Sequence, residues 1–501
     1  MADTYILALD QGTSSSRAML FDRTGRVVAQ ESQPFRQYYP QPGWVEHDPQ
    51  DIWRSQLSVA QQVLRHARGS STQVAAIGLT NQRETTLMWD RDSGEPIYPA
   101  IVWQCRRTAP LVETLRQQGW EQEVHRRTGL VLDAYFSATK VRWLLDHVPG
   151  ARQWAREGRL AFGTVDTWLL YNFSGGILHC TDPSNAARTM LYNIETCRWD
   201  TEILRALDIP ATLLPEVRDS SGAFGTTAAQ YFDGTSIPLG GVIGDQQGAL
   251  FGQACFQPGA VKNTYGTGSF VLMQVGTQPV PASSHRLLTT VAWSLDGQVS
   301  YALEGSIFAT GSTIQWLRDE LQLLQHAAES ETLASSVPDT NGVYLVPAFT
   351  GLGAPHWDMH ARGLLMGLTQ GTTRAHIVRA ALEAMAYQTR DVIEAMVAAT
   401  GMTVPLVRVD GGAAVNNFVL QFQSDMLQLP VQRPHVVQTT ALGAAYLAGL
   451  AVGYWDDQQQ LVNNWCLDRE YTPHLPAEQS DQLYRGWQEA VRRARNWAVA
   501  R

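Results

Sequence analysis

Residues 7–17 read Leu-Ala-Leu-Asp-Gln-Gly-Thr-Ser-Ser-Ser-Arg, an apolar run that ends in a carboxylate, a glycine and several hydroxyls. The following residues 18–26 predict a second strand and a turn. This order differs from the strand, glycine loop and helix of dinucleotide and P-loop sites. A tight loop over 12–16 turns backbone N–H groups and hydroxyls inward, which suits phosphate oxygens. Asp10 is placed to meet the magnesium that accompanies a nucleotide, so the segment predicts ATP held on a β-hairpin.

Length and charge narrow the classes of function. A chain of 501 residues is too long for one ordinary core and predicts two large domains. A net charge of −9 argues against nucleic acid or an anionic membrane surface as the main partner. Only Lys140 and Lys262 are lysines, and neither lies in a Walker A loop or a protein-kinase motif.

The five cysteines are scattered and show no metal spacing, which indicates reduced thiols. The histidines also lack the spacing of a zinc site. The first residues do not have the basic and apolar regions of a signal peptide, and no apolar run approaches membrane-spanning length. We therefore expect a cytoplasmic protein with no integral membrane segment.

The order of predicted elements indicates two related α/β lobes. Strands are predicted at 5–9, 17–22, 26–31, 74–80 and 100–103, and a helix from Pro49 to His66 with Asp48 as its N-cap. The hairpin at 9–20 has an approximate echo at 261–275. A strand at 406–410, a helix ending near 428, a small-residue helix over 440–453 and a final helix over 479–498 follow. We place the lobes at 1–250 and 251–501.

Gly244-Asp-Gln-Gln-Gly248 places a second carboxylate between a strand and a helix. An aspartate there is often only an N-cap. A carboxylate at a strand end is also suited to take the proton of an attacking hydroxyl. We favour Asp245 as a general base, with Asp10 on the metal side.

Arg83 and Glu84 follow the apolar strand 75–79. Neighbouring Arg and Glu residues usually form a surface ion pair. At the carboxyl end of a buried strand, however, a fixed donor beside a fixed acceptor suits a polyol, whose hydroxyls both donate and accept. The pattern by itself leaves Trp103 and Tyr135 as core residues. The glycine loops 265–270 and 410–417 are candidates to hold phosphates and adenosine.

These segments resemble the FGGY carbohydrate kinases over essentially the whole chain. The signature regions of the family correspond to residues 135–143 and to Gly363-Leu-Leu-Met-Gly367-Leu, with His376 and Glu383 downstream. More specific are Leu-Asp-Gln-Gly-Thr-Ser-Ser-Ser-Arg, Asn-Gln-Arg-Glu-Thr, Ile-Val-Trp-Gln-Cys-Arg-Arg-Thr and Gly-Asp-Gln-Gln-Gly, which resemble the members that phosphorylate glycerol. The resemblance implies two ribonuclease-H-like lobes of the actin, hexokinase and Hsp70 type, with ATP in the cleft between them.

The resemblance also implies an activity and its residues. The activity is ATP-dependent phosphorylation of glycerol to sn-glycerol 3-phosphate, the first step of glycerol catabolism, by a homodimer or homotetramer. Asp245 is implied as the base, and the hydroxyls of glycerol are implied to contact Arg83, Glu84, Tyr135, Asp245 and Gln246. Trp103 and Phe270 are implied against the carbon face of glycerol. The implied nucleotide-binding residues are Thr13, Ser14, Ser15, Arg17, Thr267, Gly311, Gln315, Gly412 and Asn416.

Two alternatives stay open: a kinase of dihydroxyacetone, erythritol or a ketopentose, and a non-kinase ATPase of the actin or Hsp70 type.

A departure from the family concerns regulation. Members inhibited by fructose 1,6-bisphosphate resemble one another in a Gly-Gly-Thr-Arg-like segment, whereas Ser236 stands here in place of the arginine, and the stretch 230–232 has no phosphorylatable histidine. We therefore expect neither form of control.

Overall fold

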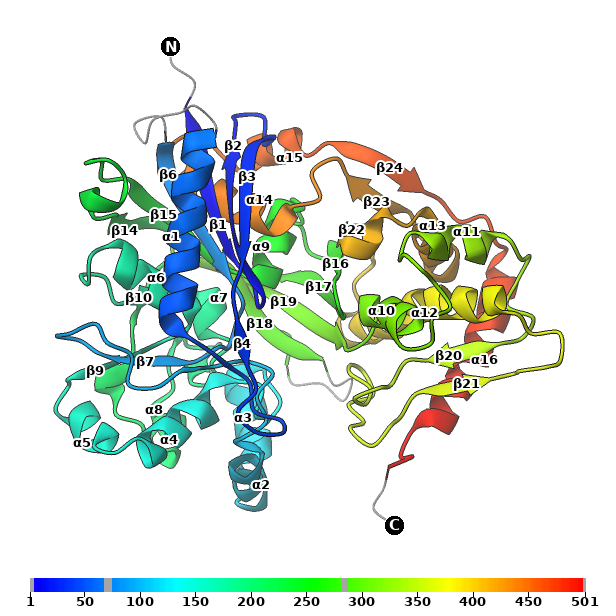
Figure 1. The fold of residues 1–501 in the computed structure, drawn as a ribbon, viewed down its shortest axis with the longest axis horizontal. Helices are drawn as coiled ribbons and strands as arrows, with labels where there is room; N and C mark the ends of the chain where they lie inside the picture. The colour runs from blue at the N-terminus through cyan, green and yellow to red at the C-terminus, as the bar shows by residue number, and fades with distance from the viewer. Residues whose placement is uncertain (1–3, 67–73, 282–286, 499–501) are drawn as a thin grey trace.

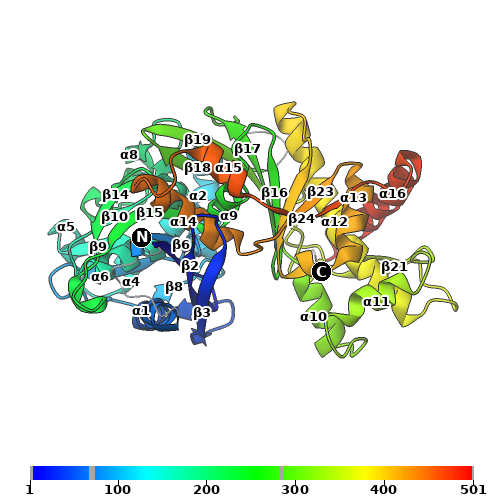
Figure 2. The ribbon, with the colours of Figure 1, turned by 90° about the horizontal axis from the view of Figure 1, so that it is seen from above.

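The computed structural model describes residues 4–66, 74–281 and 287–498. Two mixed β-sheets dominate it, one in each half of the chain (Figure 1). Seen from above, the halves lie side by side, with β16 and β17 near the boundary between them (Figure 2). The strands of the two large sheets are β1 (Tyr5–Gln11), β2 (Ser15–Phe21), β3 (Val27–Pro34), β6 (Val74–Asn81), β14 (Ser221–Thr226), β15 (Pro238–Gly244), β16 (Val261–Tyr265), β17 (Ser269–Gly276), β18 (Leu288–Leu295), β19 (Gln298–Ile307), β22 (Val407–Gly411), β23 (Val431–Pro434) and β24 (Leu467–Tyr471).

The two sheets share one topology around their first strands. The first sheet has the order β14-β15-β6-β1-β2-β3, and β1 runs antiparallel to β2 and parallel to β6. The second has the order β18-β19-β17-β16-β22-β23-β24, and β16 runs antiparallel to β17 and parallel to β22. Because a hairpin followed by parallel neighbours recurs, the echo of 9–20 at 261–275 is confirmed as a structural repeat.

Two helices lie between the sheets. One apolar cluster joins Ile6 and Ala8 of the first sheet to Leu272 of the second through α9 (Asp245–Gly252) and α14 (Thr439–Ala451). The helices touch backbone to backbone, since a Cβ on Gly443 of α14 would lie 1.9 Å from the carbonyl oxygen of Gly248. The small-residue face predicted at 440–453 is thus a packing surface, and α14 from the second half of the chain covers the sheet of the first.

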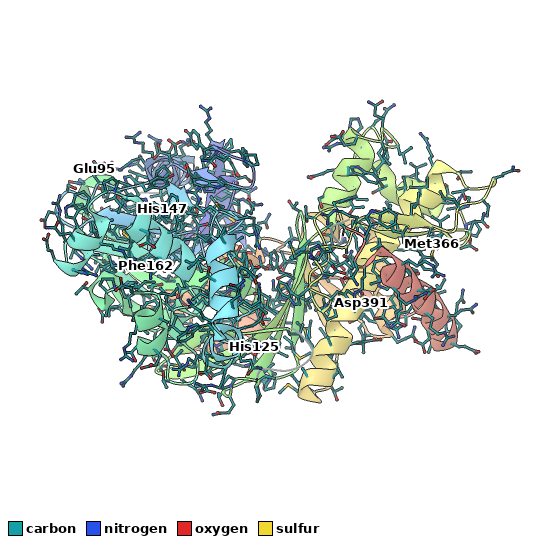
Figure 3. All side chains as sticks on the ribbon, turned by 90° about the horizontal axis from the view of Figure 1, so that it is seen from below. Glu95, His125, His147, Phe162, Met366 and Asp391 are labelled. Carbon is teal, nitrogen blue, oxygen red and sulfur yellow. The ribbon has the colours of Figure 1, made fainter. Side chains whose placement is uncertain are left out.

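The outer faces of the sheets are covered by helices from their own halves. Leu7 and Leu9, which alternate with Ile6 and Ala8, pack against α1 (Pro49–His66) and α6 (Val165–Phe173). The second sheet packs against α12 (Arg374–Thr400) and α13 (Asn417–Leu427). Asp391 of α12 accepts hydrogen bonds from the Tyr484 hydroxyl (2.5 Å) and Trp487 Nε1 (2.9 Å) of α16 (Ala477–Ala494), and Figure 3 shows it beside that helix.

The remaining elements form smaller units around the two sheets. A third apolar core lies under the helices of residues 100–213. The elements not yet given are β4 (Gln37–Tyr38), β5 (Glu46–His47), β7 (Leu87–Asp90), β8 (Ala100–Ile101), α2 (Ala109–Gln117), α3 (Trp120–Thr128), α4 (Ser137–His147), α5 (Ala151–Arg156), β9 (Leu160–Gly163), β10 (Cys180–Thr181), α7 (Pro183–Ala186), β11 (Tyr192–Asn193), β12 (Arg198–Trp199), α8 (Thr201–Ala206), η2 (Ala211–Leu213), β13 (Glu216–Val217), η3 (Ala229–Tyr231), α10 (Gly311–Asp319), α11 (Glu329–Ser335), β20 (Tyr344–Val346), β21 (Leu364–Met366), η4 (Gly412–Val415) and α15 (Gln458–Asn464).

The predicted elements agree closely with these bounds. The helix predicted from Pro49 to His66 is confirmed, with the Asp48 carboxylate accepting from the Gln50 N–H at 2.8 Å. All five cysteines lie in the described ranges and none of them forms a disulfide there. Within the same ranges, no helix is both long and apolar enough to cross a membrane. The division into lobes at residue 250 stays a prediction.

Candidate active site

The loop between β1 and β2 is as tight as the sequence predicts. The Gly12 N–H donates to the Ser15 carbonyl at 3.0 Å, and Ser14 is exposed beside the partly buried Thr13. Ser16 turns away and pairs with Ser55 of α1 at 2.9 Å. The hydroxyls of 13–15 therefore stay available at the surface of the loop, whereas the hydroxyl of Ser16 belongs to the core.

Asp10 is the second-last residue of β1, beside this loop, and is only 9% exposed. Burial raises the pKa of its carboxyl; Arg17, whose Nη1 lies 3.9 Å from Asp10 Oδ2, lowers it, and Asp245 raises it. The two carboxylates that the sequence separates by more than 200 positions are thus close enough to influence each other, because β1 and β15 are both neighbours of β6.

Asp245 begins α9 directly after β15. Its Oδ1 forms an ion pair with Arg83, 3.0 Å from Nε, and accepts from the Gln246 backbone N–H at 2.7 Å, and 30% of its side chain is exposed. A carboxylate held through one oxygen and partly open to solvent has the geometry of an oriented base.

Arg83 and Glu84 do not form a surface ion pair, because only 2% of each side chain is exposed. Arg83 Nη1 donates to Glu304 Oε2 at 2.5 Å and to Gln247 Oε1 at 3.1 Å, and its Nη2 donates to Glu304 Oε1 at 3.2 Å. Burial would raise the pKa of Glu304, but the charges of Arg188 and Arg83 outweigh it and lower that pKa to about 2.

Glu84 has the backbone conformation of a strained site residue. Its φ of 62° lies in the left-handed region, which costs a non-glycine residue about 1–3 kcal/mol. Hydrogen bonds from Ser137 Oγ (2.9 Å) and Thr86 Oγ1 (3.0 Å) hold its carbonyl in place. These hydrogen bonds compensate the strain locally.

Trp103 and Tyr135 are partly exposed. The pattern by itself had placed both in the core, and that prediction was wrong. Their rings pack edge to face with centroids 5.5 Å apart, and Trp103 Nε1 donates to Thr13 Oγ1 at 3.0 Å. Burial, together with the charge of Glu84, raises the pKa of the Tyr135 phenol. The two rings thus connect the loop at Thr13 to the surroundings of Glu84.

Gln246 and Phe270 are joined by a buried lysine. Lys262 Nζ donates to Gln246 Oε1 at 2.6 Å, to Thr264 Oγ1 at 2.9 Å and to the Phe270 carbonyl at 3.3 Å. The Phe270 ring lies 5.8 Å from the Arg83 guanidinium. Burial lowers the pKa of Lys262 to about 8, although Asp410 and Glu304 oppose that shift.

The predicted nucleotide residues of the second half gather at the ends of β16 and β22. The Thr267 carbonyl accepts the N–H groups of Thr310 and Ser312 at 3.0 Å each, which joins its loop to the start of α10. Thr267, Gln315 and Gly412 are exposed, and Gly311 is half-buried. Asn416 instead caps α13 by accepting from the Val419 N–H at 3.1 Å, and its Nδ2 donates to Ser330.

The structure therefore assembles one cluster from Asp10, Arg83, Glu84, Trp103, Tyr135, Asp245, Gln246 and Phe270. The sequence analysis missed three charged members of that cluster: Arg188, Lys262 and Glu304. A signal for two of them was present, since Lys262 and Glu304 are each the one charged residue of their strand, β16 and β19. Arg188 follows a short helix and carried no such signal.

Comparisons with known proteins identify the family of this chain. The N-terminal domain model of the FGGY family of carbohydrate kinases matches residues 5–252, and the C-terminal domain model matches 261–452. A glycerol kinase of Symbiobacterium thermophilum is 60% identical over 495 residues, 99% of each chain. Glycerol kinase 2 of Thermotoga maritima is 57% identical over 493 residues, covering 98% of this chain and 99% of that one.

Solved structures show the same fold. The crystal structure of Plasmodium falciparum glycerol kinase with ADP superposes with a TM-score of 0.92 at 34% identity, over 98% of both chains. Gluconate kinase from Lactobacillus acidophilus has a TM-score of 0.87 at 21% identity, covering 100% of this chain and 99% of that chain, and shows the fold alone. The paired sheets, the buried charge cluster and the full-length similarity together place this chain in the FGGY family of carbohydrate kinases.

Proposed function

We propose that this kinase transfers the γ-phosphoryl group of ATP to glycerol, forming sn-glycerol 3-phosphate. The observation that carries the proposal is the placement of Arg83 and Glu84 beside the partly open carboxylate of Asp245. A guanidinium donates only and an ionised carboxylate accepts only, whereas each hydroxyl does both. A fixed donor beside a fixed acceptor, with a base next to them, therefore suits a vicinal polyol.

Asp245 is the base of the proposed mechanism. Its contacts with Arg83 and Gln246 fall on Oδ1, which leaves Oδ2 to take the proton of the attacking hydroxyl. The hydroxyl oxygen then attacks the γ-phosphorus as the bond to the ADP oxygen breaks in line. Trp103 and Phe270 cover the carbon face of glycerol and exclude water, which would otherwise compete as the acceptor.

The nucleotide is proposed to lie across the ends of both sheets. Its phosphates would be bound by Thr13, Ser14, Ser15 and Arg17, and the rest of the nucleotide by the loops that carry Thr267, Gly311, Gln315, Gly412 and Asn416. Asp10 fits a Mg²⁺ ion that travels with ATP, because such ions take one or two carboxylates and fill their other positions with phosphates and water. When bound, Mg²⁺ neutralises charge on the transferring phosphates.

Substrate discrimination gives a direct prediction. A diol that lacks one hydroxyl leaves Arg83 or Glu84 unpaired, which costs about 1–3 kcal/mol, or roughly a 5- to 150-fold loss. We expect kcat/KM for glycerol to exceed that for 1,2-propanediol by a factor of roughly 5 to 150. The measurement is ADP release in a coupled assay with ATP, Mg²⁺ and a panel that includes dihydroxyacetone, erythritol and a ketopentose.

The same panel separates the alternatives. A higher kcat/KM for dihydroxyacetone, erythritol or the ketopentose would identify the corresponding sibling kinase. ATP hydrolysis that is slow and not stimulated by any polyol would identify an ATPase of the actin or Hsp70 type. Neither result is compatible with the proposed glycerol specificity.

The environment of Lys262 predicts a pH dependence. Its ammonium holds Gln246 Oε1 and loses its proton as the pH rises through about 8. We expect KM for glycerol to rise above that pH, because a neutral amine donates a weaker hydrogen bond to Gln246 than an ammonium does. We expect Lys262→Met to show a raised KM at every pH. Steady-state kinetics between pH 6 and 10 test this; an unchanged pH profile in the variant would contradict it.

Location, oligomeric state and partners are also part of the proposal. We propose a cytoplasmic homodimer or homotetramer, for which sedimentation of the purified chain is the direct measurement. The net charge of −9 supports small-molecule substrates rather than nucleic acid as partners.

A further inference from the structure

Arg188 is a fully buried cation beneath the proposed polyol site. It follows α7 and none of its surface is exposed. Its Nε donates to Glu84 Oε1 at 2.6 Å, and its Nη2 donates to Glu304 Oε1 at 3.0 Å. A buried guanidinium is costly unless it is paired, so two carboxylates held at hydrogen-bond distance indicate a specific role for this side chain.

The contact with Glu84 selects one carboxylate oxygen. The Glu84 side chain forms ion pairs with Arg188 and, at a greater distance, with Arg83, and both fall on Oε1. Oε2 therefore remains as the oxygen that can accept from a substrate hydroxyl. Burial raises the pKa of Glu84, and the charge of Arg188 is the strongest influence that lowers it.

Arg188 also lies under the neighbouring aromatic residues. Its guanidinium carbon is 5.8 Å from the Tyr135 ring centroid and 5.4 Å from that of Phe136. Glu304 Oε1 accepts from Arg188 and from Arg83 alike, so one oxygen of β19 joins the two guanidinium groups. The positions of the donor Arg83 and the acceptor Glu84 therefore depend on one connected network of ion pairs, which runs through Arg188 and Glu304.

We propose that Arg188 is a positioning residue for polyol recognition, which aims the Glu84 carboxylate so that Oε2 accepts a substrate hydroxyl. Arg188 itself does not touch the substrate; it acts through Glu84. The inference rests on the proposed function, because it assigns Glu84 to the polyol. It adds a specificity determinant that lies outside the residues implied by the family resemblance.

The test is Arg188→Met, which keeps a long unbranched side chain and removes its charge and donors. We expect KM for glycerol to rise at least tenfold, with kcat at saturating glycerol and KM for ATP close to those of the parent, because lost ground-state binding raises KM alone. Without Arg188, Glu84 becomes easier to protonate, so the raised KM falls again as the pH increases from 6 to about 7, a range in which Lys262 keeps its proton. Arg188→Lys restores a charge without the planar fork and is expected to lie between the two.

A double-mutant cycle with Glu84→Gln makes the test specific. If Arg188 acts through Glu84, Arg188→Met has little further effect on KM for glycerol in the Glu84→Gln background. Equal loss toward glycerol and ATP, a pH-independent rise in KM, or additive effects in the cycle would overturn the inference. If Arg188→Met does not fold, the cycle is run with Arg188→Lys. Glycerol turnover by the parent is measured alongside, so failure of the proposed function is recognised separately.

Discussion

Asp245→Asn is expected to lower kcat by about 10²–10⁴-fold, the range that a positioned general base contributes, with glycerol still bound. Asparagine keeps an oxygen in the place of Asp245 Oδ1, which lies 3.0 Å from Arg83 Nε and accepts from the Gln246 N–H. The amide cannot take a proton from the attacking hydroxyl. Single-turnover measurement with ATP and glycerol, together with glycerol titration of the variant, separates the chemical step from binding.

Asp48→Asn is the matched control. Asp48 also lies at a helix N-terminus, where its carboxylate accepts from the Gln50 N–H, and asparagine caps helices as well as aspartate does. We expect its kcat to stay close to that of the parent. A near-parental rate in Asp245→Asn would contradict the role of Asp245, and an equal loss in both variants would show that a carboxylate at either helix start matters only for folding.

Glu304→Gln is expected to have the largest effect on stability. Glu304 is fully buried and pairs with Arg83 and Arg188, so a neutral replacement leaves two buried guanidinium groups without their shared counter-charge. Removing one partner of a buried ion pair costs about 3–5 kcal/mol. We expect a loss of this size at pH 7, measured as the shift of the denaturant midpoint. Glu202→Gln, in an exposed pair with Arg205, is expected to cost less than about 1 kcal/mol.

The effect of Glu304 depends on pH in a defined direction. Its pKa is lowered in the fold to about 2 from the ordinary value of 4.5. A lowered carboxyl pKa stabilises the fold above the unfolded value and is lost as the pH falls toward the folded one. The difference between the parent and Glu304→Gln should therefore be full above about pH 4.5 and shrink toward pH 2. A difference that stays constant over that range would contradict the assignment.

Much of the fold follows from local patterns. The alternation in β1 sends Leu7 and Leu9 to one face and Ile6 and Ala8 to the other, and helices cover both faces as such a pattern requires. Pro49 after Asp48 locates the start of α1, because both residues act on the first turn. These features depend on neighbours in the chain and are therefore visible in the sequence.

Parts of the site could not be predicted in this way. Arg83 and Glu84 look like an ordinary surface pair until β19 brings Glu304 beside them from more than 200 positions away. Trp103 and Tyr135 could be assigned to the core by pattern and to the site only by family resemblance. Their partial exposure depends on how the helices of residues 100–213 pack, which no local pattern encodes.

The sequence by itself determined the hairpin of residues 7–17, the second carboxylate loop at 244–248 and the family to which both belong. Only the tertiary structure decided that Asp10 and Asp245 influence each other and that Arg188, Lys262 and Glu304 complete the site. The physical reason is burial. A local pattern records the strand or helix that a residue prefers, but a buried charge is tolerated only when distant segments supply its partner.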